Sequence, residues 1–487
     1  MTQNDASSWI QEEFSSHAFS DDRLHKRLLK ITKSLAEAPT LSINQACAEW
    51  AAVKGAYRFF DNNSVSSDLI LDPHYRITYE RSLPDDRILI VQDTSKINYD
   101  SHRATEGLSS YSTSKGFETH GLITHTALAV NTDGVPLGVI DQKTWTRSID
   151  DDVKELSEYK NYKRPIEEKE SYRWIEALKK SKERMPDKDI VIVGDRENDI
   201  YEFFQEALIE DVNFVVRSSS PRTIEDTSGL HQNMDHKLRK LPEMGRVCLH
   251  IPAKQGVAAR SAVLELRFTE VMLLSRPRGI KIARSDTRVD IPLNVVELVE
   301  RNPPKGIKAL HWRILTNLKV NNDKEALEII HYYKQRWQIE TFFKILKSTC
   351  KVEDCRLGHA EKLIKFIALK SIIAWRIYWA TMLRRESSEL PADCIITTAE
   401  WKSAWVTLNY KKNKREKIPN QIPEKVPTLD TVIKWIAQLG GWLGRKGDGE
   451  PGVMSIAKGW QRIESGAMMW ETMNDQCKKP TTDESCG

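Results

Sequence analysis

The sequence predicts a mixed α/β protein in which a β-rich central part lies between two helical regions. Residues 1–70 space their apolar side chains as helices do, short apolar runs typical of strands follow, and helical spacing returns from about residue 360. A length of 487 residues allows two to four domains. We expect domains at 1–70, 71–365 and 366–475, and then a polar tail at 476–487.

Composition narrows the class of protein. Charged residues make up 29% of the chain and hydrophobic residues 40%, as in ordinary globular proteins, and a net charge of +4 is only a weak sign of a nucleic-acid partner. Seven scattered cysteines without CxxC spacing predict reduced thiols. The first 20 residues lack the apolar core of a signal peptide, and charged residues interrupt the longest apolar stretch, Leu363–Leu383. We therefore expect a cytoplasmic protein and a buried or interface helix at that stretch.

The N-terminal region reads as short helices. Ser20–Asp22 supplies a helix cap, followed by a basic helix with apolar residues spaced at four, three and four: Leu24, Leu28, Ile31 and Leu35. A second helical stretch contains Trp50 and the motif Gly55-Ala-Tyr-Arg-Phe59.

Strands are predicted next. The apolar run Arg87–Gln92 ends at Asp93, and two further runs, Leu122–Val130 and Val135–Ile140, flank the hairpin turn Asn131–Gly134. These three runs predict an antiparallel meander.

Helix and strand then alternate. A charged helix at about 165–184 precedes the buried strand Asp189–Val193, which ends at Gly194-Asp195, and a helix near 199–209 precedes the strand Phe214–Val216. A meander followed by such alternation is the order of an RNase H-like sheet. Both strand-end aspartates fall where open sheets hold ligands.

The rest of the chain departs from that alternation. Residues 220–316 contain β-rich segments with Pro and Gly breaks, which we interpret as a β insertion into the catalytic domain. A long helix from about Asp323 to Lys347 returns to the core, and residues 360–475 are helical apart from a loop near 411–427.

One stripe of the long predicted helix combines four polar side chains. At about 100° per residue they fall within an arc of roughly 60°: Tyr333, Arg336, Glu340 and Lys347. The carboxylate can bind a divalent metal, and the hydroxyl and the cations can hold phosphates. For any single charge, a solvated helix face is the more usual interpretation. The order Y-x2-R-x3-E-x6-K after two strand-end aspartates favours a site.

This combination resembles the signature of the DDE transposases of the IS-four family. Further segments resemble the family and follow one another in the family's order along nearly the whole chain: Gly55–Phe59, Asp195-Arg-Glu-x-Asp199-Ile, Asn302–Gly306, Arg336-Trp-x-Ile-Glu340 and Ala437-x-Leu-Gly-Gly441. The resemblance implies cut-and-paste DNA transposition. The enzyme nicks the transposon end, the new 3′-hydroxyl attacks the opposite strand to form a hairpin, water opens the hairpin, and the freed end joins target DNA.

The resemblance also assigns the active site. Two Mg²⁺ ions, replaceable by Mn²⁺, would be held by three carboxylates, since oxygen ligands suit these ions better than Zn²⁺: Asp93, Asp195 and Glu340. DNA phosphates would be held by Tyr333, Arg336 and Lys347. At Phe343, relatives often have His, so no polar contact is carried over there.

Two residues match family positions near the hairpin. Trp312 matches a tryptophan that stacks on a flipped base, a contact that recovers roughly 1–3 kcal/mol. Its residue type alone favours a tryptophan in the core of the insertion. Arg217 matches an arginine beside the hairpin, and a strand-end surface charge is the alternative.

The expected partners are double-stranded transposon-end DNA, target DNA and a second copy of the chain. Arg27 and Arg58 match family arginines that contact end DNA. The apolar helix beginning near Val453 is a dimerisation surface by resemblance, whereas its spacing alone equally allows an intramolecular core. Two other functions remain open: a catalytically inactive transposase-derived DNA-binding inhibitor, and an RNase H-like nuclease.

Overall fold

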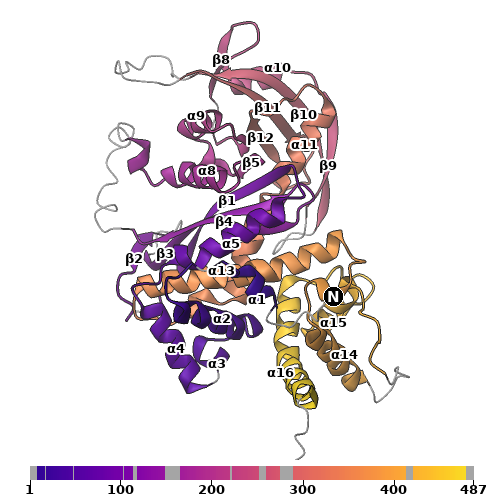
Figure 1. Cartoon of the computed structure of the whole chain (residues 1–487). Coiled ribbons are helices and arrows are strands. Elements are labelled where there is room, and N and C mark those ends of the chain that lie inside the picture. Colours follow the sequence, from indigo (N-terminus) through magenta and orange to yellow (C-terminus); the bar gives the residue numbers. More distant parts are fainter. Residues whose placement is uncertain are drawn as a thin grey trace, which may run out of the picture.

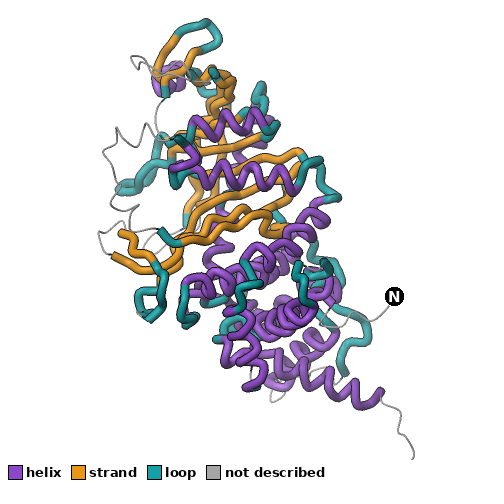
Figure 2. The backbone as a smooth tube through the Cα atoms, turned by 60° about the vertical axis from the view of Figure 1, so that its left-hand side comes forward, coloured by secondary structure: helices purple, strands orange, loops and turns teal. Residues whose placement is uncertain are grey.

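A large sheet and a block of helices make up the structure, which is a computed structural model (Figure 1). It describes residues 8–478 apart from 17, 48, 103, 113–117, 148–164, 220–221, 252–258, 275–288 and 413–420. The strands gather in one part of the molecule, and the N-terminal and C-terminal helices pack together in the other (Figure 2). The two terminal regions are therefore neighbours in space although they are far apart in the sequence.

Helices form the N-terminal region, as predicted. They are α1 (Ser8–Glu13), α2 (Asp22–Glu37), α3 (Ile43–Ala46), α4 (Trp50–Asp61) and α5 (Ser67–Ser82). The side chain of Asp21 caps α2 by accepting a hydrogen bond from the Arg23 amide, which confirms the predicted cap. The predicted stripe is buried at Leu28, Ile31 and Leu35. Helix α5, which the sequence did not predict, packs between the sheet and the C-terminal helices.

The predicted strands are present in the central sheet. The meander consists of β1 (Arg87–Asn98), β3 (Glu118–Asn131) and β4 (Pro136–Trp145), with the short β2 (Ser109–Ser112) beside β3. Gly134 has a φ of 95° in the β3–β4 turn, the left-handed conformation that glycine adopts without strain. Strands β5 (Asp189–Gly194) and β6 (Asn213–Arg217) continue the sheet parallel to β1.

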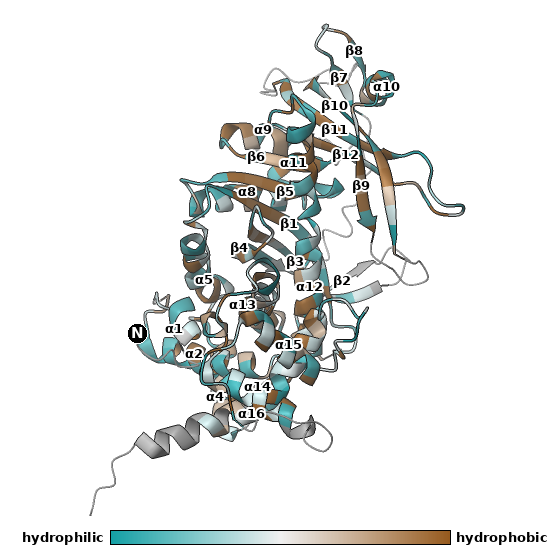
Figure 3. Cartoon of the chain, turned by 90° about the vertical axis from the view of Figure 1, so that its right-hand side faces the viewer, coloured by the Kyte–Doolittle hydropathy of each residue, from teal (hydrophilic) through white to brown (hydrophobic). Residues whose placement is uncertain are grey.

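Both faces of the central strands are covered, so the strands are apolar throughout (Figure 3). Ile88 and Ile90 of β1 share a core with α8 (Tyr172–Arg184) and α9 (Tyr201–Ile209). Leu89 and Val91 instead share a core with the helices that follow residue 323. Because successive residues of a strand face opposite sides, this alternation also decides which way the residues at the strand end point.

Residues 223–316 are β-rich, as predicted, but they do not form a separate sheet. Their elements are β7 (Thr223–Glu225), β8 (His231–Asn233), α10 (Met234–Lys240), β9 (Gly245–Ile251), β10 (Arg260–Leu273), β11 (Ile291–Glu300) and β12 (His311–Thr316). Strand β12 pairs antiparallel with β6, so the insertion extends the central sheet to 12 strands within the described residues.

The single helix predicted from Asp323 to Lys347 is wrong. The structure has α11 (Asp323–Lys334), α12 (Trp337–Lys344) and the π-helical turn η3 (Ile345–Thr349), with a break at Gln335–Arg336. No Pro or Gly marks this break. Side chains around it bind the β3–β4 turn instead: Gln338 Nε2 donates to Gly134 O (2.8 Å), and His331 Nε2 lies 2.8 Å from Thr132 O. Tertiary contacts that no local pattern contains therefore accompany the break.

The C-terminal region is helical. It contains the turn η4 (Val352–Asp354), then α13 (Ala360–Glu386), η5 (Ala392–Cys394), α14 (Thr398–Lys412), α15 (Leu429–Leu439) and α16 (Val453–Lys478). Helix α13 is long and apolar enough to span a membrane, but 78% of its apolar window is buried inside the protein. This confirms the predicted buried helix at Leu363–Leu383. The domain boundary expected at residue 365/366 falls inside α13.

Candidate active site

Asp93 and Asp195 meet at one edge of the sheet because their strands are parallel neighbours. Val91 of β1 pairs with Val193 of β5. Asp93 lies two residues further along β1, which continues beyond the predicted strand end to Asn98, and Asp195 lies directly after the end of β5. By strand alternation both aspartates face the side of Leu89 and Val91, toward α11 and α12. Each carboxylate accepts a local amide: Thr94 N donates to Asp93 Oδ1 (2.7 Å), and Glu197 N donates to Asp195 Oδ1 (2.8 Å).

The pKa of Asp93 depends on the charges of the two other predicted metal ligands. Burial and then the negative charge of Asp195 raise the pKa of Asp93 to about 7, with a smaller contribution from Glu340. The Thr94 amide and the Arg336 guanidinium act in the opposite direction. The structure therefore brings the three predicted metal ligands within electrostatic reach of one another.

Glu340 is bound to an arginine. Arg336 Nη2 donates to Glu340 Oε1 at 2.7 Å, and the arginine side chain is only 11% exposed. In the part of the chain that the structure describes, no three His, Cys, Asp or Glu side chains are grouped closely enough to hold a metal ion as they stand. The three carboxylates are nevertheless suited to a hard divalent cation, because all of their donor atoms are oxygen.

Tyr333, which was predicted to hold a DNA phosphate from the polar stripe of the helix, is not exposed to solvent. Its side chain is buried, and its ring meets Trp312 edge to face, with centroids 5.1 Å apart. Burial raises the pKa of Tyr333, and a hydrogen bond from Arg217 opposes that rise. Arg217 also donates to His311 O at 2.8 Å. The structure thus groups Tyr333, predicted to hold a DNA phosphate, with Trp312 and Arg217, which were both predicted to lie near the hairpin.

Lys347 contacts β1 at a point further along the strand than Asp93. On the π-helical turn η3, its ammonium donates to Lys96 O at 2.5 Å, three residues beyond Asp93. Burial lowers the pKa of Lys347, and the negative charge of Glu353 opposes that shift.

Arg27 and Arg58 belong to the N-terminal helices. Arg58 is exposed in the last turn of α4, whereas Arg27 is half-buried on α2 and lies against Gly55 of α4. A Cβ added at Gly55 would lie 2.2 Å from Arg27 Nη1. The glycine of the Gly55–Phe59 motif therefore makes room for one of the two predicted DNA contacts.

Sequence reasoning missed two groups beside the aspartates. Asp199, quoted only as part of a motif, is buried and binds the loop after Arg217: it accepts from Ser219 N (2.7 Å) and from Arg222 Nη2 (2.6 Å). Its place four residues after Asp195 was the available signal. Arg173 on α8 binds Thr94 of β1 and Glu197 of the turn after Asp195. Nothing in the sequence indicated this role, since a lone arginine on a charged helix is ordinary.

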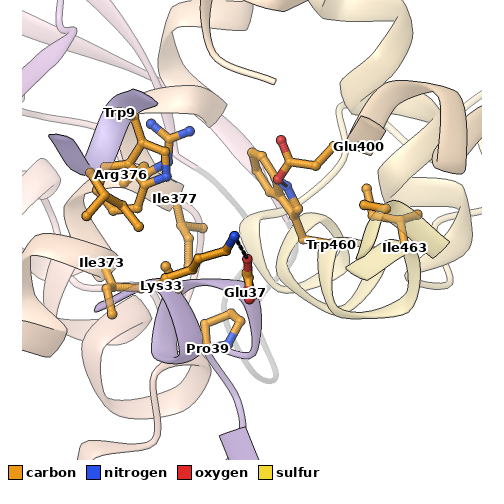
Figure 4. A pocket seen from close by; sticks show the side chains of 13 residues that line it. Trp9, Lys33, Glu37, Pro39, Ile373, Arg376, Ile377, Glu400, Trp460 and Ile463 are labelled. Atoms are coloured by element: carbon orange, nitrogen blue, oxygen red, sulfur yellow. Dashed lines mark hydrogen bonds and ion pairs between the residues drawn. The ribbon is translucent and has the colours of Figure 1, made fainter. Parts of the chain in front are cut away.

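A pocket lies apart from these residues, where the N-terminal and C-terminal helices meet (Figure 4). The Arg376 guanidinium lies 4.1 Å from the ring centre of Trp9 on one wall, and Trp460 Nε1 donates to Glu400 Oε1 (2.9 Å) on the other. None of the predicted active-site residues lines it.

Three families match the chain in order along its length. Transposase DNA-binding matches residues 6–65, Transposase DDE domain matches 170–375, and Transposase Tn5 dimerisation domain matches 372–472. Together they define a DNA transposase with its own DNA-binding and dimerisation domains. Residues 372–472 are thus similar to the Tn5 transposase dimerisation domain. The DDE match includes Asp195 and Glu340 and begins after Asp93.

Proposed function

We propose that the chain is a metal-dependent cut-and-paste transposase of the IS-four kind, similar to the Tn5 transposase, with an RNase H-like catalytic core. The observation that supports this proposal is that the negative charges of Asp195 and Glu340 both act on the buried Asp93 carboxyl and, together with its burial, raise its pKa. A structural ion-pair network would surround a buried aspartate with cations. Here two of the three charged side chains that act on Asp93 are carboxylates, an arrangement that a divalent cation would stabilise.

The three carboxylates would hold two Mg²⁺ ions, or Mn²⁺ in their place. Such ions activate the attacking water or 3′-hydroxyl and stabilise the leaving oxygen of an in-line phosphoryl transfer. Arg336 already lies against Glu340 and would hold that carboxylate in position while its remaining N–H groups face a phosphate. Lys347, anchored beside β1, would hold a phosphate further along the strand.

The hairpin step would use the group formed by Trp312, Tyr333 and Arg217. Tyr333 supports the indole from its edge and leaves Trp312 half-buried, so a flipped base could stack on the exposed part of the ring. Tyr333 therefore acts through Trp312 and Arg217 in this proposal, and not as a direct phosphate ligand.

End recognition and pairing complete the proposed cycle. Arg27 and Arg58 would contact end DNA from α2 and α4. Two monomers would pair through the C-terminal helices, each holding one transposon end before target DNA is captured. Ile456 and Ile463 of α16 are buried within the chain, so pairing must use other residues of this helix, such as the 66% exposed Met469.

The test is nicking of a supercoiled donor plasmid that carries matched transposon ends. The wild-type protein should nick with Mg²⁺ or Mn²⁺, and Asp93→Asn should bind end DNA without nicking. An inactive inhibitor would bind ends and nick nothing. A general RNase H-like nuclease would cleave plasmids with and without the ends alike.

A further inference from the structure

On the other face of the sheet, a series of side chains connects β1, which carries Asp93, with the turn after β5, which carries Asp195. Strand alternation turns Thr94 away from Asp93, toward α8. There the Thr94 hydroxyl lies 2.8 Å from Arg173 Nε and 2.9 Å from His125 Nδ1. Arg173 can only donate, so the hydroxyl accepts from Arg173, and it shares a second hydrogen bond with His125 Nδ1. The Thr94 hydroxyl therefore joins Arg173 to His125.

His125 is a buried, neutral imidazole. It is buried in β3, directly across from Thr94 in the β1–β3 register, with its ring edge-on to Trp174 at 4.8 Å. Burial, and then the positive charge of Arg173, hold its pKa well below the ordinary value. The imidazole is therefore neutral, and its Nδ1 faces the Thr94 hydroxyl.

Arg173 reaches the second aspartate loop with its remaining nitrogens. Its Nη2 donates to Glu197 Oε2 at 2.7 Å, and its Nη1 donates to Glu170 O at 2.8 Å. Glu197 is the residue whose amide binds Asp195, just as Thr94 is the residue whose amide binds Asp93. One guanidinium therefore holds the side chains of the two residues whose backbones orient the two aspartates.

We propose that Arg173 is a positioning residue that sets the separation and orientation of Asp93 and Asp195 through Thr94 and Glu197. The inference rests on the proposed metal-dependent function, because its purpose is to hold two carboxylates at the spacing that divalent ions require. A single planar group with donors in fixed directions suits this task better than two independent contacts, which could move separately. Residues that orient metal ligands typically change metal affinity 10- to 100-fold when they are lost.

The test compares variants that differ by one hydrogen bond. Thr94→Val keeps the shape of the side chain and removes the hydroxyl, whereas Thr94→Ser keeps the hydroxyl. Arg173→Lys keeps the positive charge but loses the planar guanidinium with its several donors. Glu197→Gln changes an exposed side chain with little risk to folding. Arg246→Ala is the matched control, because it breaks an arginine–glutamate pair in the β insertion.

Mn²⁺ binding to the free protein, measured by calorimetry, is the readout that does not depend on activity. Thr94→Val and Arg173→Lys should bind Mn²⁺ about tenfold more weakly or worse, and they should need correspondingly more Mg²⁺ for half-maximal nicking. Thr94→Ser and Arg246→Ala should stay within about twofold of the wild type, and metal-free melting temperatures should be similar. Glu197→Gln should show an intermediate loss.

Different results would overturn the positioning role of Arg173 and the proposed metal-dependent function. If the wild type binds Mn²⁺ and Thr94→Val and Glu197→Gln bind it equally well, the positioning role is overturned and the proposed function stands. If the wild type itself neither binds Mn²⁺ nor nicks with Mg²⁺, the proposed function fails and the positioning role fails with it. A melting temperature lowered in Thr94→Val alone, with Mn²⁺ binding by Glu197→Gln and Arg173→Lys unchanged, also overturns the inference.

Discussion

The guanidinium of Arg27 lies directly against the α-carbon of Gly55, so that any larger residue at position 55 would displace it. The atoms displaced are the far end of a flexible side chain and not backbone. Folding should therefore tolerate an added methyl group, whereas the direction of the arginine should not.

We predict that Gly55→Ala weakens binding to transposon-end DNA by roughly 1–3 kcal/mol, the cost of losing one specific arginine contact. Arg27→Ala should cost a similar amount, and the double variant should be no worse than either single one, because both changes remove the same contact. Gel-shift titration at fixed salt measures this. The control is Gly452→Ala, where an added Cβ meets nothing within 4 Å. Additive losses in the double variant would show that Gly55 acts independently of Arg27.

Trp312→Ala should slow hairpin formation selectively. If stacking worth roughly 1–3 kcal/mol is lost wholly at that step, hairpin formation slows by about five- to 150-fold while first-strand nicking continues. Truncating a fully buried tryptophan typically costs about 3–5 kcal/mol of folding stability. The Trp312 indole is half-buried against Tyr333, so we expect Trp312→Ala to cost about 1–2 kcal/mol. Melting temperature, nicking and hairpin yield from one preparation decide between the roles. Loss of nicking in proportion to lost stability would mark Trp312 as a core residue only.

The α15–α16 contact depends on two glycines. A Cβ at Gly440 would lie 1.7 Å from Ser455 O, and one at Gly459 would lie 1.7 Å from Ile436 O. Both of these oxygens are backbone atoms, so adding a Cβ at Gly440 or Gly459 would force α15 and α16 apart. We predict that Gly459→Ala destabilises the C-terminal domain by several kcal/mol and abolishes paired-end complexes, whereas Gly452→Ala does neither. Chemical denaturation and native gels measure the two effects. Normal paired-end complexes from Gly459→Ala would show that this packing is not needed for dimerisation.

The same contact limits what truncation can show. Removing the chain from Val453 would strip Ile456 and Ile463 from the core that they share with Ile433 and Ile436. The truncated protein would lose both stability and pairing. Point changes on the exposed side of α16 are therefore the cleaner test of the dimer surface.

Sequence patterns predicted those parts of the fold that local physics decides. The runs before Asp93 and Asp195 are apolar because both strand faces are covered, and the Asn131–Gly134 turn requires a glycine with positive φ. Such patterns could not predict three other features of the fold: the break at Gln335–Arg336, the burial of Tyr333 and the pairing of β12 with β6. Each depends on a partner distant in the sequence, such as Gly134 for Gln338 or Trp312 for Tyr333. Arg173 escaped notice for the same reason.

The most direct test of the central claim is the metal dependence of nicking by isosteric triad variants. Asp93→Asn, Asp195→Asn and Glu340→Gln should each bind end DNA within a few-fold of the wild type. Each should lower the Mg²⁺-dependent nicking rate by at least about 1,000-fold, equivalent to roughly 4 kcal/mol of transition-state stabilisation. Asp141→Asn serves as the control, since Asp141 is a buried aspartate bound to Arg184 outside the site. Near-normal nicking by any one of the three triad variants would contradict the proposed active site.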